Sequence, residues 1–404
     1  MRDNGRYHFL WLSSILMLLL LLTGCSKSSD NSGDEPQPGK AVLKVYVFAP
    51  DRPVVTRADN GDVDASKAEN EIKNLHVWVY RSDNQDLVGH ISLNNVELSQ
   101  AGKEVSMELN DNYAALENKP NVDVYVAANV SKTNCGLTFD ASTTSTQLKD
   151  ALIKEGYFGV SNLIKTVPAD GLPMSGVMLN KPVGGSNPVY QVRESTEGTT
   201  LANVRLVRAV SKIRFIACKS STNPDAVTVN SVKLNADVLP KEQYLFLDNA
   251  YDLATPKWKV NTEAGYVAET ELVAGVTELA VNDSPTSYSW DGTMTGQAYE
   301  SKIQKGIDDG ELTDLGTFYL RESDKKLAGT IKYTIKHTEA QKNGTEDPIE
   351  SSPAFSMNDE GDFSRNHTWI VYAYFISSGD LILAMVEVMN WTSSENTSQS
   401  VYNW

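Results

Sequence analysis

Short segments in which apolar and polar residues alternate recur along this chain, and they constrain its fold more than any other feature. In the first of them, residues 41–48, Leu43, Val45 and Val47 fall on one face of a strand. Turn-forming residues separate the segments, and little of the sequence has helical spacing. Further segments of this kind lie at residues 71–80, 87–93, 105–109, 121–130, 203–219, 227–234, 329–337, 368–376 and 381–391.

The pattern predicts an all-β protein made of tandem antiparallel β-sandwiches with a minor helical part. The length of 404 residues leaves room for two such domains. Residues 181–198 are rich in Gly, Ser, Pro and Glu, so we place an N-terminal domain at 58–199 and a C-terminal domain at 200–404. One helix is expected at residues 143–153. Residues 249–316 have few apolar repeats and are expected to be irregular.

A single arginine follows the first predicted strand. Pro50 and Pro53 end that strand, because proline cannot donate to a sheet ladder, and Arg57 and Ala58 lie in polar sequence. The site is typical of trypsin-like cleavage. A cut there would remove residues 41–57 as a propeptide strand and leave its place in the sheet empty. The alternative is that Arg57 is simply a solvated loop residue.

The beginning of the chain predicts export and lipidation. Residues 1–24 combine a basic start with an apolar run of signal-peptide length that is too short to span a membrane. The run ends in Leu-Thr-Gly before Cys25, which is the pattern of a bacterial lipobox. We expect cleavage before Cys25 and a diacylglycerol anchor on its thiol. An ordinary signal peptide with an incidental cysteine is the alternative. Residues 25–40 are predicted to be a flexible tether.

Composition and spacing exclude several classes of function. The net charge of −16 argues against nucleic acid binding. The 5 His residues are scattered without metal-ligand spacing, so neither a metal site nor a cofactor is expected. Of the 3 Cys, Cys135 and Cys218 lie in different predicted domains and are expected to be buried free thiols rather than a disulfide. Ser175 lacks a nucleophile-elbow sequence, and no catalysis is expected.

Several pieces of the sequence, taken in order, resemble one family. After the lipobox, the strand and the arginine site comes EIKNLHVWVY at residues 71–80. The later pieces are LPMSG at 172–176, LVRAVSKIRF at 206–215, FYLRES at 318–323 and RNHTWIVYAYF at 365–375. Together they are similar to the fimbrillins, the major fimbrial subunits of type V pili in Gram-negative anaerobes. The resemblance covers most of the mature chain and implies two transthyretin-like sandwiches in series.

The resemblance also implies a mode of assembly. An outer-membrane lipoprotein precursor held by Cys25 would be cut after Arg57 by an arginine-specific protease. The C-terminal segment of another fimbrial subunit would then fill the vacated groove by strand exchange and build an extracellular fimbrium. In this chain the candidate donor face is the set Ile382, Ala384, Val386 and Val388, with the tail to Trp404 as a further candidate.

Other functions remain open at this stage. The C-terminal strand could pair only within its own domain, and the subunit could be a tip or accessory adhesin that binds a host or bacterial surface ligand. A glycan-binding surface lipoprotein is the main alternative, because Trp258 and Trp290 lie in the long irregular region. A hydrolase is a weaker one, because no spacing singles out a pair of carboxylates.

Overall fold

The structure is a computed structural model of the chain. It describes residues 40–48, 67–98, 102–185, 188–192, 203–223, 225–247, 261–288, 296–338, 348–356, 363–377, 380–390 and 399–402. Cys25, Arg57 and Ala58 lie outside these ranges, as do Trp258 and Trp290.

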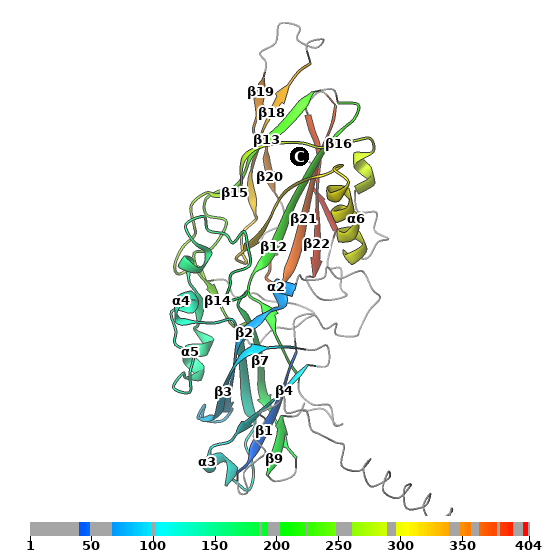
Figure 1. Ribbon diagram of the computed structural model, residues 1–404. Coiled ribbons are helices and arrows are strands. Elements are labelled where there is room, and N and C mark those ends of the chain that lie inside the picture. The colour runs from blue at the N-terminus through cyan, green and yellow to red at the C-terminus, as the bar shows by residue number, and fades with distance from the viewer. Residues whose placement is uncertain are drawn as a thin grey trace, which may run out of the picture. The chain divides into compact units, whose positions relative to one another are not determined.

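The N-terminal sandwich is built from two sheets (Figure 1). In the first sheet the order is β10-β1-β9-β8, and β4 also pairs with β1. Its strands are β1 (Val42–Phe48), β4 (Lys103–Glu108), β8 (Val183–Gly184), β9 (Val189–Val192) and β10 (Asn203–Arg205). The second sheet has the order β11-β7-β5-β2-β3, with β11 (Val207–Arg208), β7 (Met174–Lys181), β5 (Val122–Ala128), β2 (Ile72–Arg81) and β3 (Leu87–Val96).

The C-terminal sandwich also has two sheets. One has the order β16-β12-β21-β22-β23, and β17 also pairs with β12. Its strands are β12 (Ser211–Ser220), β16 (Val281–Asn282), β17 (Thr313–Leu320), β21 (His367–Ser377), β22 (Asp380–Asn390) and β23 (Gln399–Tyr402). The other has the order β15-β13-β18-β19 with β20 on β18, and comprises β13 (Ala226–Leu234), β15 (Thr270–Glu278), β18 (Ala328–Lys336), β19 (Ile349–Ser351) and β20 (Ala354–Ser356).

Helices are short and lie outside the sheets. They are α2 (Lys67–Asn70), α3 (Asp111–Ala114), α4 (Lys132–Cys135), α5 (Ser145–Lys149), α6 (Gly296–Asp308) and the 3-10 turns η1 (Glu155–Phe158) and η2 (Pro285–Tyr288). In Figure 1, α4 and α5 lie beside the N-terminal sandwich, and α6 covers the face of β12, β21 and β22. A two-stranded sheet, β6 (Leu152–Ile153) with β14 (Gln243–Tyr244), joins the two halves of the chain.

Each sandwich has its own apolar core. The N-terminal core contains Leu43, Val45 and Val47 from one sheet and Leu75 and Val77 from the other. These five side chains have no exposed area. Alternation produces this arrangement, because every second residue of each strand faces the opposite sheet.

The prediction of an all-β protein with two sandwiches and little helix is confirmed. The sheets are mixed rather than wholly antiparallel, since β1 runs parallel to β9 and β10, and β12 runs parallel to β21. Parallel neighbours need a long connection between them, and alternation carries no information on strand direction. β10 and β11 follow the predicted boundary at residue 199 in sequence, yet they pair with β1 and β7.

Two local predictions were wrong. The helix expected at 143–153 ends as α5 at Lys149, because residues 152–153 pair with β14 far along the chain. The region 249–316 contains β15 and the helix α6, whose Tyr299 and Ile303 are one turn apart and fully buried.

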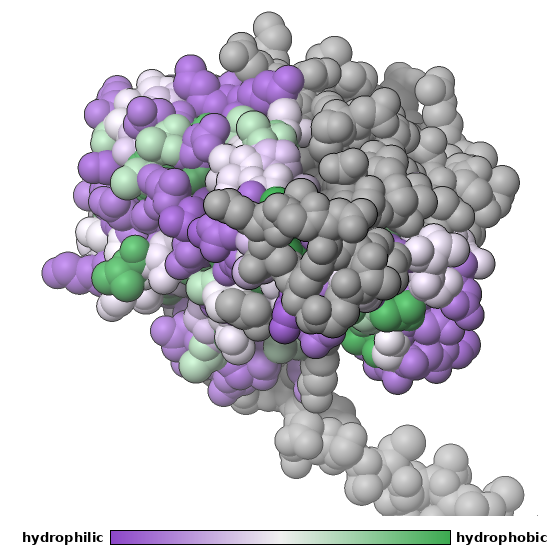
Figure 2. All heavy atoms as spheres, turned by 90° about the horizontal axis from the view of Figure 1, so that it is seen from above, coloured by the Kyte–Doolittle hydropathy of each residue, from purple (hydrophilic) through white to green (hydrophobic). Residues whose placement is uncertain are grey.

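The described surface is largely hydrophilic, and two cysteines are buried. Figure 2 shows a largely hydrophilic face among the described residues, with apolar residues in small separate patches. Cys135 and Cys218 are buried free thiols, as expected, and burial raises the pKa of Cys135 to about 12 and that of Cys218 to about 11. Within the described ranges no helix has the length and apolar character needed to cross a membrane.

Gly176, in the LPMSG piece, allows β10 to pass close over β7. A Cβ added there would collide with the backbone oxygen of Arg205. We therefore expect Gly176→Ala to destabilise the protein by about 1–3 kcal/mol through overpacking. Gly156→Ala is the matched control, because its added carbon would meet nothing within 4 Å. Urea unfolding followed by fluorescence measures both, and equal midpoints for the two variants would contradict the close approach.

Candidate functional site: the first strand and the junction beside it

β1 is an inner strand of its sheet. On one side it pairs antiparallel with β4 from Val42 to Val47. On the other side β9 pairs with residues 42–44 and β10 with residues 46–48, both parallel to β1. The backbone of β1 is therefore hydrogen-bonded along both edges, and its removal would leave a slot between β4 and the β9–β10 pair.

The two faces of β1 have different surroundings. Leu43, Val45 and Val47, predicted to share one face of the strand, lie in the N-terminal core with no exposed area. On the other face the Lys44 ammonium lies 2.7 Å from a carboxylate oxygen of Glu104 on β4. The Tyr46 hydroxyl donates to the same carboxylate, and this hydrogen bond raises the pKa of Tyr46. Sequence reasoning did not find Glu104, because cross-strand pairing is needed to identify it.

The residues on either side of the segment that carries Arg57 contact the same short stretch of the chain. At the start of the segment, the amide of Leu206 donates to the backbone oxygen of Phe48, at 3.0 Å. At its end, Arg208 donates to the backbone oxygen of Glu69 at 3.3 Å and to the side chain of Asn70 in α2. Residues on both sides of 49–66 thus bind residues 206–208.

α2 is also held by the C-terminal sandwich. The carboxylate of Glu69 is buried, and Lys212 on β12 places its ammonium 3.1 Å away. The hydroxyl of Tyr319 on β17 donates to the same carboxylate at 2.6 Å. Burial and the nearby Glu69 carboxylate both raise the pKa of Tyr319. A charged residue of α2, downstream of the candidate cut site, is therefore anchored in the other sandwich.

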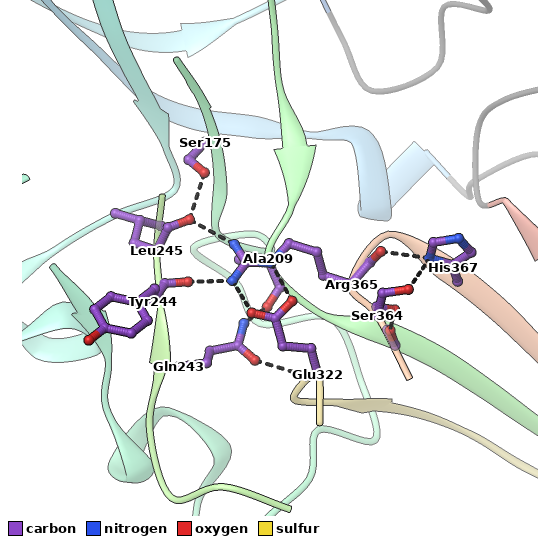
Figure 3. Close-up of polar contacts among 10 residues, drawn as sticks. Ser175, Ala209, Gln243, Tyr244, Leu245, Glu322, Ser364, Arg365 and His367 are labelled. Atoms are coloured by element: carbon purple, nitrogen blue, oxygen red, sulfur yellow. Dashed lines mark hydrogen bonds and ion pairs between the residues drawn. The ribbon is translucent and has the colours of Figure 1, made fainter. Parts of the chain in front are cut away.

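A second polar network lies at the same junction (Figure 3). The guanidinium of Arg365 forms a two-pronged ion pair with Glu322, with one contact at 2.9 Å, and both side chains are almost fully buried. The backbone oxygen of Leu245 accepts from Arg365 at 2.8 Å and from the Ser175 hydroxyl at 2.6 Å. Gln243 completes the network by bonding the backbone oxygen of Ala209 and the amide of Glu322.

Arg321 makes a third contact between the sandwiches. Its guanidinium lies 3.8 Å from the ring centre of Phe158. It also donates to the backbone oxygens of Asn162, at 3.0 Å, and Glu155, at 3.3 Å. Burial lowers the pKa of Arg321 to about 10. Arg208, Arg321 and Arg365 are among the largest fully buried side chains of the described residues.

The separated sequence pieces that carried the family resemblance meet here. LPMSG supplies Ser175, LVRAVSKIRF supplies Arg208 and Lys212, FYLRES supplies Arg321 and Glu322, and RNHTWIVYAYF supplies Arg365. Their common feature is a charged or polar residue at the end of an apolar strand. A charged or polar residue at the end of a strand indicates a buried ion pair only when its partner is known. The sequence therefore did not predict the junction.

Comparison with known proteins finds a family that the N-terminal part of the chain resembles. Residues 41–210 match the family model described as major fimbrial subunit protein (FimA). The match begins just before β1 and ends just after β11, so it takes in the strands of the first sandwich. The N-terminal sandwich is therefore similar to this family. No curated protein matches the sequence.

One solved structure is similar to this chain in fold over both sandwiches. A candidate cell adhesion protein from Parabacteroides distasonis has a TM-score of 0.51 at 14% identity, covering 89% of this chain and 99% of that one. At this identity the likeness establishes the fold alone. A candidate cell adhesion protein from Bacteroides eggerthii has a TM-score of 0.47 at 15% identity, with 91% and 100% covered. The tip fimbrial protein Mfa3 from Porphyromonas gingivalis has 0.42 at 13%, with 87% and 100% covered.

The candidate donor strand lies in the C-terminal sandwich. β22 pairs antiparallel with β21 along its length, with Ala384, Val386 and Val388 opposite Ala373, Val371 and Trp369. Ile382 falls at an irregularity in this pairing. β23 pairs with residues 384–387 and ends the sheet order, so it is the edge strand.

The structure also bears on metal binding and on Ser175. Among the residues that the structure describes, no group of three or more His, Cys, Asp or Glu is arranged to hold a metal ion. Ser175 bonds a backbone oxygen in the junction, which fits the structural role expected for it.

The buried Arg365–Glu322 pair should be sensitive to the loss of one partner. Glu322→Gln leaves the buried guanidinium charge uncompensated, so we expect a loss of about 3–5 kcal/mol. The control is Glu350→Gln, which breaks an exposed pair with Lys332 at 2.8 Å and should cost under about 1 kcal/mol. Chemical unfolding of both variants measures this. A loss as small for Glu322→Gln as for the control would show that the pair contributes little.

Proposed function

We propose that this protein is a structural subunit of a cell-surface fimbria, assembled by exchange of a strand, and that it contributes to adhesion without catalysis or a cofactor. The precursor is exported as a lipoprotein and held at the outer membrane through Cys25. An arginine-specific protease cuts between Arg57 and Ala58 and releases residues 41–57. The C-terminal segment of another fimbrial subunit then occupies the slot, and the chain becomes part of an extracellular fimbrium.

The observation that carries the proposal is the double pairing of β1. A strand at a sheet edge could leave without changing the rest of its sheet. β1 instead lies between β4 on one side and β9 and β10 on the other. Its departure exposes unpaired backbone on both sides, which favours the entry of another strand.

Burial of apolar side chains also favours the entry of another strand. Fully burying Leu43, Val45 and Val47 stabilises the fold by about 1.5–3 kcal/mol for each side chain. An empty slot forfeits that stabilisation, and a donor with apolar residues at alternate positions regains it. A precursor that retains β1 already fills its own slot, which keeps it from assembling before cleavage.

The pairing sets the direction of the incoming strand. A donor that takes the place of β1 runs parallel to β9 and β10 and antiparallel to β4. We assign the donor to residues 380–404, where Ile382, Ala384, Val386 and Val388 offer the required alternation. Because the slot and the donor are different surfaces, the contact is head to tail and produces a filament.

The cut site is tested by replacing the arginine. In full-length protein produced in the native host cells, Arg57→Ala should leave an uncut lipidated monomer and abolish the ladder of denaturant-resistant polymers on gels. Arg52→Ala is the matched control in the same segment, and it should assemble normally. N-terminal sequencing of assembled wild-type protein should begin at Ala58. Ladders that persist in Arg57→Ala would overturn the proposal.

A further inference from the structure

Residues 203–208, here named the coupling segment, connect the slot to the junction between the sandwiches. The segment consists of β10, Leu206 and β11. Its first half belongs to the sheet of β1, and its second half pairs with β7 in the opposite sheet. The chain then continues directly into β12 of the C-terminal sandwich.

The first half depends on the strand in the slot. Tyr46, Val47 and Phe48 pair with residues 203–205, and the Leu206 amide donates to the Phe48 oxygen. Among the described strands, β1 is the only one that pairs with β10. An empty slot therefore leaves the backbone of β10 without its sheet partner, although Val204 and Leu206 still pack in the core.

The second half organises the junction. Arg208 has no exposed area, and its guanidinium bonds Glu69 and Asn70 in α2. It also donates to the side chain of Asn366, at 3.3 Å, just before β21. The Asn366 amide in turn donates to the backbone oxygen of Val210 at 2.8 Å. One arginine thus joins the residues after the cut site, the coupling segment and the C-terminal sandwich.

We propose that Arg208 couples the occupancy of the slot to the stiffness of the junction. With a strand in the slot, β10 is paired and presents Arg208 to α2 and Asn366. With the slot empty, β10 loses its pairing, the contacts of Arg208 weaken, and the two sandwiches move more freely. Insertion of a donor restores the junction, so a subunit becomes rigid only once it is joined to its neighbour. This inference rests on the proposed strand exchange.

The coupling is reciprocal, so the uncut chain can test it. Hydrogen exchange is measured by mass spectrometry in wild type, Arg208→Lys and Asn70→Ala. Lysine cannot reproduce the forked contacts of arginine, and Asn70→Ala removes one partner of Arg208 with less disturbance. Both variants should speed exchange at residues 46–48 and 203–206 by about fivefold or more, a coupling of ordinary size. Arg81→Lys, whose paired Asp83 lies in the same sandwich, should leave exchange at these residues unchanged.

The second arm empties and refills the slot. The chain is cut after Arg57, residues 41–57 are removed, and a synthetic peptide of residues 41–48 is added back. Emptying should speed exchange at residues 203–206 and also at the amides of Asn366 and Leu245, which bond across the junction. The peptide should reverse both changes. Amides in β13 and β18 should not respond.

The outcomes distinguish a failure of the coupling from a failure of the proposed strand exchange. If emptying the slot speeds exchange at residues 203–206 but leaves the junction unchanged, the coupling is overturned. The coupling is also overturned if Arg208→Lys and Asn70→Ala speed exchange at the junction but not at residues 46–48 and 203–206. A cut fragment that never leaves wild-type protein would instead contradict the proposed strand exchange, and the uncut variants would still decide the coupling.

Discussion

The pairing of β1 along both of its edges is the constraint on which the rest of the N-terminal sandwich depends. An inner strand satisfies the backbone groups of its neighbours as well as its own, and buried backbone groups are costly to leave unpaired. β4, β9 and β10 are brought into one sheet by contact with this single strand. The core residues Leu43, Val45 and Val47 tie the same strand to the opposite sheet. A chain built in this way cannot lose the strand and keep its fold unchanged unless another strand replaces it.

The junction follows a different physical rule. Buried charges are tolerated when they are paired and hydrogen-bonded on all sides. Arg365 meets Glu322 and two backbone oxygens, and Lys212 meets Glu69. Arginine suits such a place because its fork binds several acceptors at fixed angles. The Lys212–Glu69 contact joins the two sandwiches. Because an ion pair depends on direction, it restricts how one sandwich lies on the other more than apolar packing would.

Sequence reasoning was most accurate where local pattern decides structure. Alternating residues located β1, β2, β5 and β18 to within a residue or two, because the burial of one face imposes a period of two. It failed where distant pairing decides. Residues 152–153 follow a capped helix but become a strand because residues 243–244 lie beside them. In α6 the spacing of Tyr299 and Ile303 was visible, yet it was lost in a region with few other apolar residues.

Local sequence is therefore enough to specify a β-rich chain of two sandwiches, a first strand with one apolar face, and an arginine after it. Neighbouring residues specify those features, because their spacing decides which side chains can share a face. Long-range contacts, by contrast, make the first strand an inner one and bring Glu69, Arg208, Glu322 and Arg365 to one junction. Partners in a sheet or an ion pair are chosen by contacts between residues far apart in the chain, and no local pattern specifies them.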